Sequence, residues 1–114
     1  FEYMHLDNAV CNFASINVLK YLKEDDKFDV KSFVHTIELI FTAQEILVGY
    51  SEYPTENITK TAKAYRELGI GYANLGALLM ALGLPYDSAE GRAIAAAIVT
   101  DREATPFTRT GQLA

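Results

Sequence analysis

The sequence predicts a mainly α fold, with four or so helices forming a small bundle-like domain over residues 1–103. Two observations favour helices. Apolar residues recur at helical spacing in one long stretch, 30–48, and residues 71–82 are apolar at every position except Asn74. The stretches are separated by residues that end helices, namely Gly49, Pro54, Gly83 and Pro85. We expect residues 104–114, which have little apolar periodicity, to form a flexible tail.

The first element, within residues 11–23, supports two interpretations. The spacing of Phe13, Ile16 and Leu19 is typical of a helix. The alternation of polar and apolar residues from Ser15 to Val18 is typical of a strand. Both interpretations stay open at this point.

The second element is a helix over about residues 30–48. Asp29 is placed to cap it by accepting a backbone N–H bond, and Phe28 and Phe33 have the spacing of a hydrophobic staple. One face is apolar and another is polar, which predicts an amphipathic helix. The apolar face holds Val30, Phe33, Val34, Ile37, Ile40 and Phe41, and the polar face holds Lys31, His35, Glu38, Thr42 and Glu45.

The remaining elements follow from caps and glycines. A third helix begins at Thr55 or Asn57 and ends at Gly69, with Ile58, Ala62, Tyr65 and Leu68 facing inward. Residues 71–82 form a segment buried on nearly every side. Asp87 and Glu90 resemble a capping box for a last helix over about 88–102. Gly69, Gly76 and Gly83 would form one shallow stripe if they lay on a continuous helix.

The composition excludes several classes of protein. Half of the residues are apolar and the net charge is -5, which favours a packed domain and argues against general binding to nucleic acids or anionic membranes. The most apolar run, 75–84, is too short to span a bilayer. The single cysteine, Cys11, cannot form an internal disulfide, so we expect a reducing, cytoplasmic compartment.

Most chemically active side chains have an ordinary structural interpretation. The glycines at 69, 71 and 76 do not have the spacing of a nucleotide-binding loop. His5 and His35 do not belong to any motif with metal-ligand spacing, so the sequence predicts no metal site and no cofactor-binding residues. Taken alone, Cys11 is typical of a small buried side chain and Glu2 of a charge near a chain end.

Two separated motifs change the interpretation of Glu2 and Cys11. The first reads EYMHLDNAVCNFASIN over residues 2–17. The second reads RELGIGYANLGALLM over residues 66–80 and continues with GLPYDS at 83–88. Together they resemble the catalytic subunit of ribonucleotide reductase, most closely its adenosylcobalamin-dependent class. The resemblance covers roughly residues 2–100.

The resemblance implies a fold and a chemistry. Family enzymes reduce ribonucleotides inside a ten-stranded α/β barrel, by thiyl-radical chemistry that starts on a finger loop reading Asn-x-Cys-x-Glu. By this resemblance Glu2 is the loop glutamate, a general base toward the substrate, and Cys11 is one thiol of the reducing pair. The implied substrate is a ribonucleotide, and the implied cofactor of the parent enzyme is adenosylcobalamin.

The sequence also departs from the family pattern. The radical cysteine would precede Phe1, and no second cysteine pairs with Cys11 within the 114 residues. We therefore expect a fragment of a larger reductase that is inactive alone, and whether the chain is itself an enzyme stays open. The alternative hypothesis is a non-catalytic helical interaction module. Its apolar segments 30–48 and 71–84 would drive self-association into a homodimer or higher oligomer.

Overall fold

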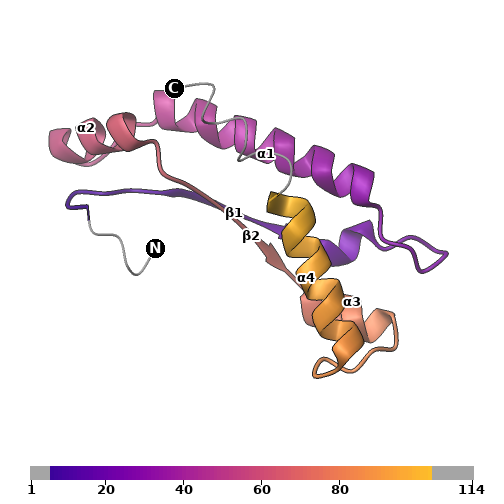
Figure 1. Ribbon diagram of the computed structural model, residues 1–114. Coiled ribbons are helices and arrows are strands. Elements are labelled where there is room, and N and C mark those ends of the chain that lie inside the picture. Colours follow the sequence, from indigo (N-terminus) through magenta and orange to yellow (C-terminus); the bar gives the residue numbers. More distant parts are fainter. Residues whose placement is uncertain (1–5, 104–114) are drawn as a thin grey trace.

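Two parallel strands form the centre of the molecule, and helices pack on one side of them and beyond their ends. The structure is a computed structural model that describes residues 6–103. The elements in chain order are β1 (Asn12–Asn17), the 3₁₀ helix η1 (Val18–Tyr21), α1 (Val30–Tyr50), α2 (Glu56–Tyr65), β2 (Leu68–Ala73), α3 (Leu75–Ala81) and α4 (Ala89–Glu103). Figure 1 shows α1 lying along the strand pair, with α2 near one end of it and α3 and α4 near the other. The molecule is elongated, with extents of 50 × 26 × 22 Å.

The predicted helical bundle is therefore wrong. β1 and β2 pair in parallel, from Asn12 opposite Leu68 to Asn17 opposite Ala73. A parallel pair needs a long crossover between its strands, and α1 with α2 supplies it. α1 and α2 thus connect the two strands of a β-α-α-β unit. They do not pack only on other helices. The segment that the sequence suggested would end one helix and begin another, residues 68–73, is the second strand.

The strand interpretation of residues 11–23 is correct for its first half. Polar and apolar residues alternate along β1, and Ile16 is its most buried side chain. The chain then tightens into η1, where the Asn17 side chain accepts a bond from the Leu19 amide. Of the three residues with helical spacing, Phe13 and Ile16 lie in β1 and only Leu19 lies in η1.

The long helix α1 confirms the local signals at its start. The Asp29 carboxylate accepts a hydrogen bond from the Ser32 amide at 3.1 Å, as an N-cap does. The rings of Phe28 and Phe33 meet edge to face with centroids 5.4 Å apart, so the hydrophobic staple is present. Similarly, Thr55 caps α2 by accepting a bond from the Ile58 amide. Helix α2 ends at Tyr65, with Arg66 as its C-cap, before the predicted Gly69.

The core lies where α1, β1, η1, α3 and α4 meet. Its buried members come from all five elements and are Ile16, Val18, Phe33, Ile37, Leu78 and Ile98. Ile70 of β2 packs against this cluster. Parallel strands are normally covered on both faces. Within residues 6–103 the helices cover one face of the strand pair, and Phe13 on the other face is 64% exposed.

The glycines at 69, 76 and 83 do not share a helix, so they do not form the stripe that a continuous helix would give. Gly69 lies in β2, Gly76 in α3, and Gly83 follows α3 with a φ of 69°. The helix stop at Gly83 is confirmed, because this left-handed conformation favours glycine. At the start of α4 the Ser88 hydroxyl accepts the Gly91 amide bond, so Ser88 makes the cap bond that the sequence assigned to Asp87.

Two glycine-to-alanine substitutions should shift stability in opposite directions. A Cβ at Gly91 would lie 2.9 Å from the Pro85 carbonyl oxygen, so Gly91→Ala should lower the free energy of unfolding by about 1–3 kcal/mol. A Cβ at Gly76 would meet Tyr86 at an ordinary 3.9 Å, so Gly76→Ala should be neutral or raise stability by up to about 1 kcal/mol. Urea unfolding followed by circular dichroism measures both, and equal effects would contradict the packing at Gly91.

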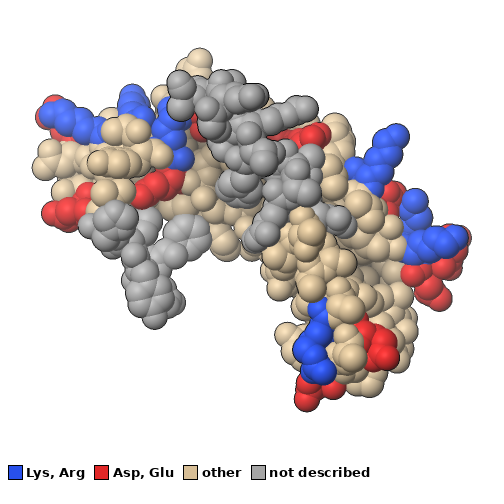
Figure 2. Space-filling view, viewed as in Figure 1, with Lys and Arg blue, Asp and Glu red and all other residues tan. Residues whose placement is uncertain are grey.

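Charged residues of both signs gather in three places on the face shown. Figure 2 shows Lys and Arg next to Asp and Glu on α2, in the turn before α1 and between α3 and α4. Each group contains an exposed ion pair: Lys60 with Glu56, Lys27 with Asp25, and Arg92 with Asp87. Exposed pairs of this kind add little stability, so the fold depends mainly on its apolar core. Between residues 6 and 103, none of the helices has the length and apolar character needed to cross a membrane.

Candidate functional site

The candidate site lies at the start of the strand pair, on and beside the face that α1 leaves uncovered. Along β1 the side chains of Asn12, Ala14 and Ile16 are more buried than those of Phe13 and Ser15. Opposite the exposed pair, β2 carries Gly69 and Gly71. A Cβ built on Gly71 would lie 3.5 Å from the Ser15 hydroxyl, which places these residues on one face. Because glycine has no side chain, β2 adds no side-chain atoms to that face at these two positions, so another group can approach the backbone closely.

Cys11 stands directly before β1 at the edge of this face. Its side chain is half-buried, and its thiol donates a hydrogen bond of 3.4 Å to the Asn12 carbonyl oxygen. The residue is a free thiol. A partly exposed thiol with a fixed direction can meet a second sulfur, which a fully buried one cannot.

Gln44 of α1 joins the two strands beside Cys11. Its side-chain amide donates to the Asn12 carbonyl oxygen at 3.2 Å and to the Gly69 carbonyl oxygen at 2.9 Å. Next to it, Arg66 donates to the Glu45 carboxylate at 2.6 Å and to the Glu45 carbonyl oxygen at 2.8 Å. Arg66 is left-handed, with a φ of 49°, and turns the chain from α2 into β2. Helix α1 thus fixes the start of both strands.

Glu67 is the acidic neighbour of Cys11. In the parallel register Asn12 lies opposite Leu68, so the residues before them, Cys11 and Glu67, occupy adjacent positions at the strand starts. Burial raises the pKa of the Cys11 thiol above its ordinary value, and the negative charge of Glu67 raises that pKa further. One carboxylate oxygen of Glu67 is buried and makes no hydrogen bond within the described part of the chain. The site therefore favours the protonated thiol.

Neutralising Glu67 should make Cys11 more reactive. Alkylation requires the thiolate, so the substitution Glu67→Gln should lower the pKa of the thiol and raise its alkylation rate at pH 8. The measurement is the pH profile of iodoacetamide labelling, with Glu24→Gln in the exposed turn before α1 as the matched control. An unchanged profile in Glu67→Gln would show that its charge does not act on the thiol.

The other residues singled out by the sequence are not brought to this site. Glu2 and His5 lie outside the described residues, so the predicted role of Glu2 stays a prediction. His35 is exposed on α1. Within residues 6–103, no three His, Cys, Asp or Glu side chains gather closely enough to hold a metal ion.

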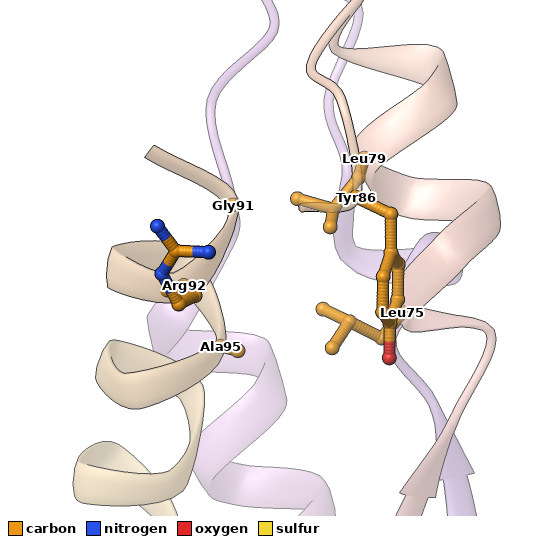
Figure 3. A pocket seen from close by; sticks show the side chains of 6 residues that line it. All are labelled: Leu75, Leu79, Tyr86, Gly91, Arg92 and Ala95. Atoms are coloured by element: carbon orange, nitrogen blue, oxygen red, sulfur yellow. The ribbon is translucent and has the colours of Figure 1, made fainter. Parts of the chain in front are cut away.

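A small pocket lies elsewhere, between α3 and α4. Figure 3 shows Leu75, Leu79 and Tyr86 on one side of it, and Gly91, Arg92 and Ala95 on the other. Its volume is about 90 Å³, well below the roughly 300 Å³ of pockets that enclose an organic ligand. The lining is mainly apolar, and the exposed Arg92 is engaged by Asp87. This pocket is a packing gap between two helices and not a second candidate site.

Comparison with known proteins gives the site its context. The sequence profile described as "Ribonucleotide reductase, barrel domain" matches residues 1–114. This chain belongs to the ribonucleotide reductase family. A protein of Streptomyces avermitilis named vitamin B12-dependent ribonucleotide reductase is 50% identical to it over 99% of the chain and 12% of that protein. The family resemblance expected from the two motifs is therefore confirmed.

More distant relatives carry similar names. A vitamin B12-dependent ribonucleotide reductase of Agrobacterium fabrum is 39% identical over 99% of the chain and 9% of its own length. A vitamin B12-dependent ribonucleoside-diphosphate reductase of Mycobacterium tuberculosis is 30% identical over 91% of the chain and 15% of its own length. The chain thus spans about a tenth of the length of these relatives. Its parallel strand pair, one face of which the described helices leave uncovered, suits a piece of a barrel wall.

Sequence reasoning missed Gln44 and Glu67 at this site. The signal for Gln44 was present, because a polar residue occupies a position whose spacing from Phe33, Ile37 and Val48 marks the buried face of α1. Glu67 had no comparable signal. Its proximity to Cys11 depends on the pairing of two strands that are 50 residues apart in the chain.

Proposed function

We propose that this chain forms part of a ribonucleotide reductase in which Cys11 supplies reducing equivalents to the substrate. The observation that carries the proposal is a partly exposed, fixed thiol at the start of a parallel strand pair, in a chain of this family. The two glycines of β2 add no side chains to the face beside the thiol, which is compatible with a substrate lying close to the backbone. The protonated state that burial and Glu67 favour suits a thiol that gives up both a proton and an electron.

The proposed reduction of the ribonucleotide needs two electrons, which Cys11 supplies together with one further thiol. Two thiols become a disulfide and release two electrons and two protons, while the ribonucleotide loses its 2′ hydroxyl as water and gains a C–H bond. The chain contains one cysteine, so the second thiol comes from elsewhere in the complete enzyme. We assign Glu2 the role of general base toward the substrate's 3′ hydroxyl, as its motif position suggests. Such thiol chemistry fits the reducing cytoplasm.

The cofactor of the complete enzyme is proposed from its relatives. Several are named as vitamin B12-dependent, which supports adenosylcobalamin as the group that initiates radical chemistry. The pocket between α3 and α4 is far too small for a corrin ring, so this pocket does not fit that group. We derive no step through the cofactor.

The proposal implies that the 114 residues do not turn over substrate alone. One cysteine cannot form the internal disulfide that the step requires. The test is a chimera in which these residues replace the matching segment of the Streptomyces avermitilis reductase. The chimera should form deoxyribonucleotides with adenosylcobalamin and a dithiol, and the isolated chain should not. An inactive but folded chimera would count against the proposal.

A second candidate function, a self-associating module, is favoured by the outer surface of α1. Beside the polar face that the sequence predicted, Leu39, Ile46 and Tyr50 are spaced seven and four residues apart and are all exposed. Exposed apolar stripes of this kind usually pack against another surface. In a complete reductase the rest of the enzyme would cover the stripe. In the isolated chain, a second copy would do so.

Self-association is directly measurable. We expect the isolated chain to form a dimer at micromolar concentration, and the double substitution Leu39→Glu with Ile46→Glu to make it monomeric. Light scattering coupled to size exclusion gives the mass. Met80→Glu, at an exposed apolar position on α3, is the matched control and should leave the dimer intact. A monomeric wild-type chain would eliminate this second candidate.

A further inference from the structure

Gln44 occupies a position that an apolar residue would fill by default. It lies on the face of α1 that also carries Ile37 and Val48, and it is only 4% exposed. Burying an amide without hydrogen bonds costs several times more than a typical surface substitution. A glutamine here therefore needs a structural or functional reason.

The hydrogen bonds of Gln44 supply that reason. Its nitrogen donates one bond to β1, at the Asn12 carbonyl oxygen, and one to β2, at the Gly69 carbonyl oxygen. Both amide hydrogens are thus used, one on each strand. The bond lengths, 3.2 and 2.9 Å, are within the range of well-formed hydrogen bonds.

The same carbonyl group also holds the thiol. The Asn12 oxygen accepts the Cys11 thiol bond and one of the two Gln44 bonds, so the two side chains share one acceptor. Asn12 stays paired with Leu68 in the sheet, but loss of the Gln44 bond would remove one constraint on the carbonyl group that also accepts the thiol bond. The Gln44 side-chain oxygen and the Asn12 side-chain nitrogen are also buried without a hydrogen bond within residues 6–103. The polar groups buried around Gln44 and Asn12 are thus more numerous than those that the pairing of β1 with β2 uses.

We propose that Gln44 is the positioning residue for the Cys11 thiol. By fixing the Asn12 carbonyl, it holds the thiol in the direction from which it reacts. The inference rests on the proposed function, in which Cys11 must meet a second sulfur. A disulfide forms only within narrow limits of distance and dihedral angle, so a thiol that rotates freely reacts less productively.

The test compares two buried positions on the same face of α1. Gln44→Met keeps the length of the side chain and removes its hydrogen bonds, whereas Val48→Ala removes only packing. Native-state iodoacetamide labelling of Cys11 is followed by mass spectrometry of the peptide that contains it. Labelling is measured in the 114-residue chain and in the chimeric reductase, so the result does not depend on how well the short chain folds.

The expected result separates positioning from stability. Gln44→Met should change the native labelling rate of Cys11 by about fivefold, on the scale of one lost hydrogen bond, and Val48→Ala should leave the rate unchanged even where it lowers stability more. In the chimera, Gln44→Met should lower kcat with little change in KM. An unchanged labelling rate in Gln44→Met, or an equal change in Val48→Ala, would overturn the inference.

A measurement on the unaltered side chain provides a second test. In protein labelled with ¹⁵N-glutamine, the Gln44 side-chain resonances should shift when Cys11 is alkylated, and a spectrum without that shift would also overturn the inference. Neither labelling nor the spectrum involves turnover. Failure of the proposed function would instead appear as full reductase activity after the removal of Cys11.

Discussion

Replacing Cys11 with serine in the chimeric reductase should abolish the formation of deoxyribonucleotides under multiple turnover. A hydroxyl cannot form a disulfide or deliver a reducing equivalent, so the loss should be on the order of 10⁴-fold, typical of removing an essential reacting group. The measurement is product formation with adenosylcobalamin and a dithiol reductant. Because a partly exposed cysteine and a serine are similar in size, the fold should survive the change.

The control for this prediction is a hydroxyl residue away from the strand pair. Thr42 is exposed on α1 and bonds only its own helix, at the Glu38 carbonyl oxygen. Thr42→Val should therefore retain the activity of the chimera. If Cys11→Ser kept more than about a tenth of the activity, Cys11 would not be a reducing thiol, because essential reacting groups are not dispensable to that degree.

The largest loss of stability is expected from Phe33→Ala. Phe33 is 1% exposed, and its ring meets Tyr21 edge to face with centroids 5.2 Å apart. Removing a buried aromatic ring leaves a cavity and costs about 3–5 kcal/mol. Because domains of this size are stable by only about 5–15 kcal/mol, the variant should be close to unfolding.

Urea unfolding of the chain and of the variant measures this loss. Met80→Ala is the control, since Met80 is 75% exposed and lies on α3, away from the apolar stripe of α1. Its substitution should change the free energy of unfolding by less than about 0.5 kcal/mol. A loss below about 1 kcal/mol for Phe33→Ala would mean that Phe33 does not anchor the core.

Local signals in the sequence predicted α1 and the start of α2 well. Asp29, Phe28 with Phe33, and Thr55 act within one helical turn, so their effect does not depend on the rest of the fold. The sequence failed at β2, where the glycines at 69 and 71 have low strand propensity and the neighbouring residues are apolar. That strand exists because β1 pairs with it, and the pairing is not visible locally.

The candidate site was predicted unevenly for a similar reason. The motif around Cys11 identified the thiol through the family, whereas the exposed apolar residues Leu39 and Ile46, which lie beside the polar face of α1, were not singled out from the sequence. A helix that packs on both sides has apolar residues on both sides. The sequence of α1 is therefore suited to a larger assembly.

We propose that these residues form a working part of a ribonucleotide reductase. The most direct test is the rate at which the chimera, with this segment in the Streptomyces avermitilis reductase, converts a ribonucleotide to its deoxyribonucleotide. We predict a rate within about tenfold of the parent enzyme, a cost of the size expected from imperfect packing at the new boundaries. A chimera that folds and binds substrate but forms no deoxyribonucleotide would contradict the account.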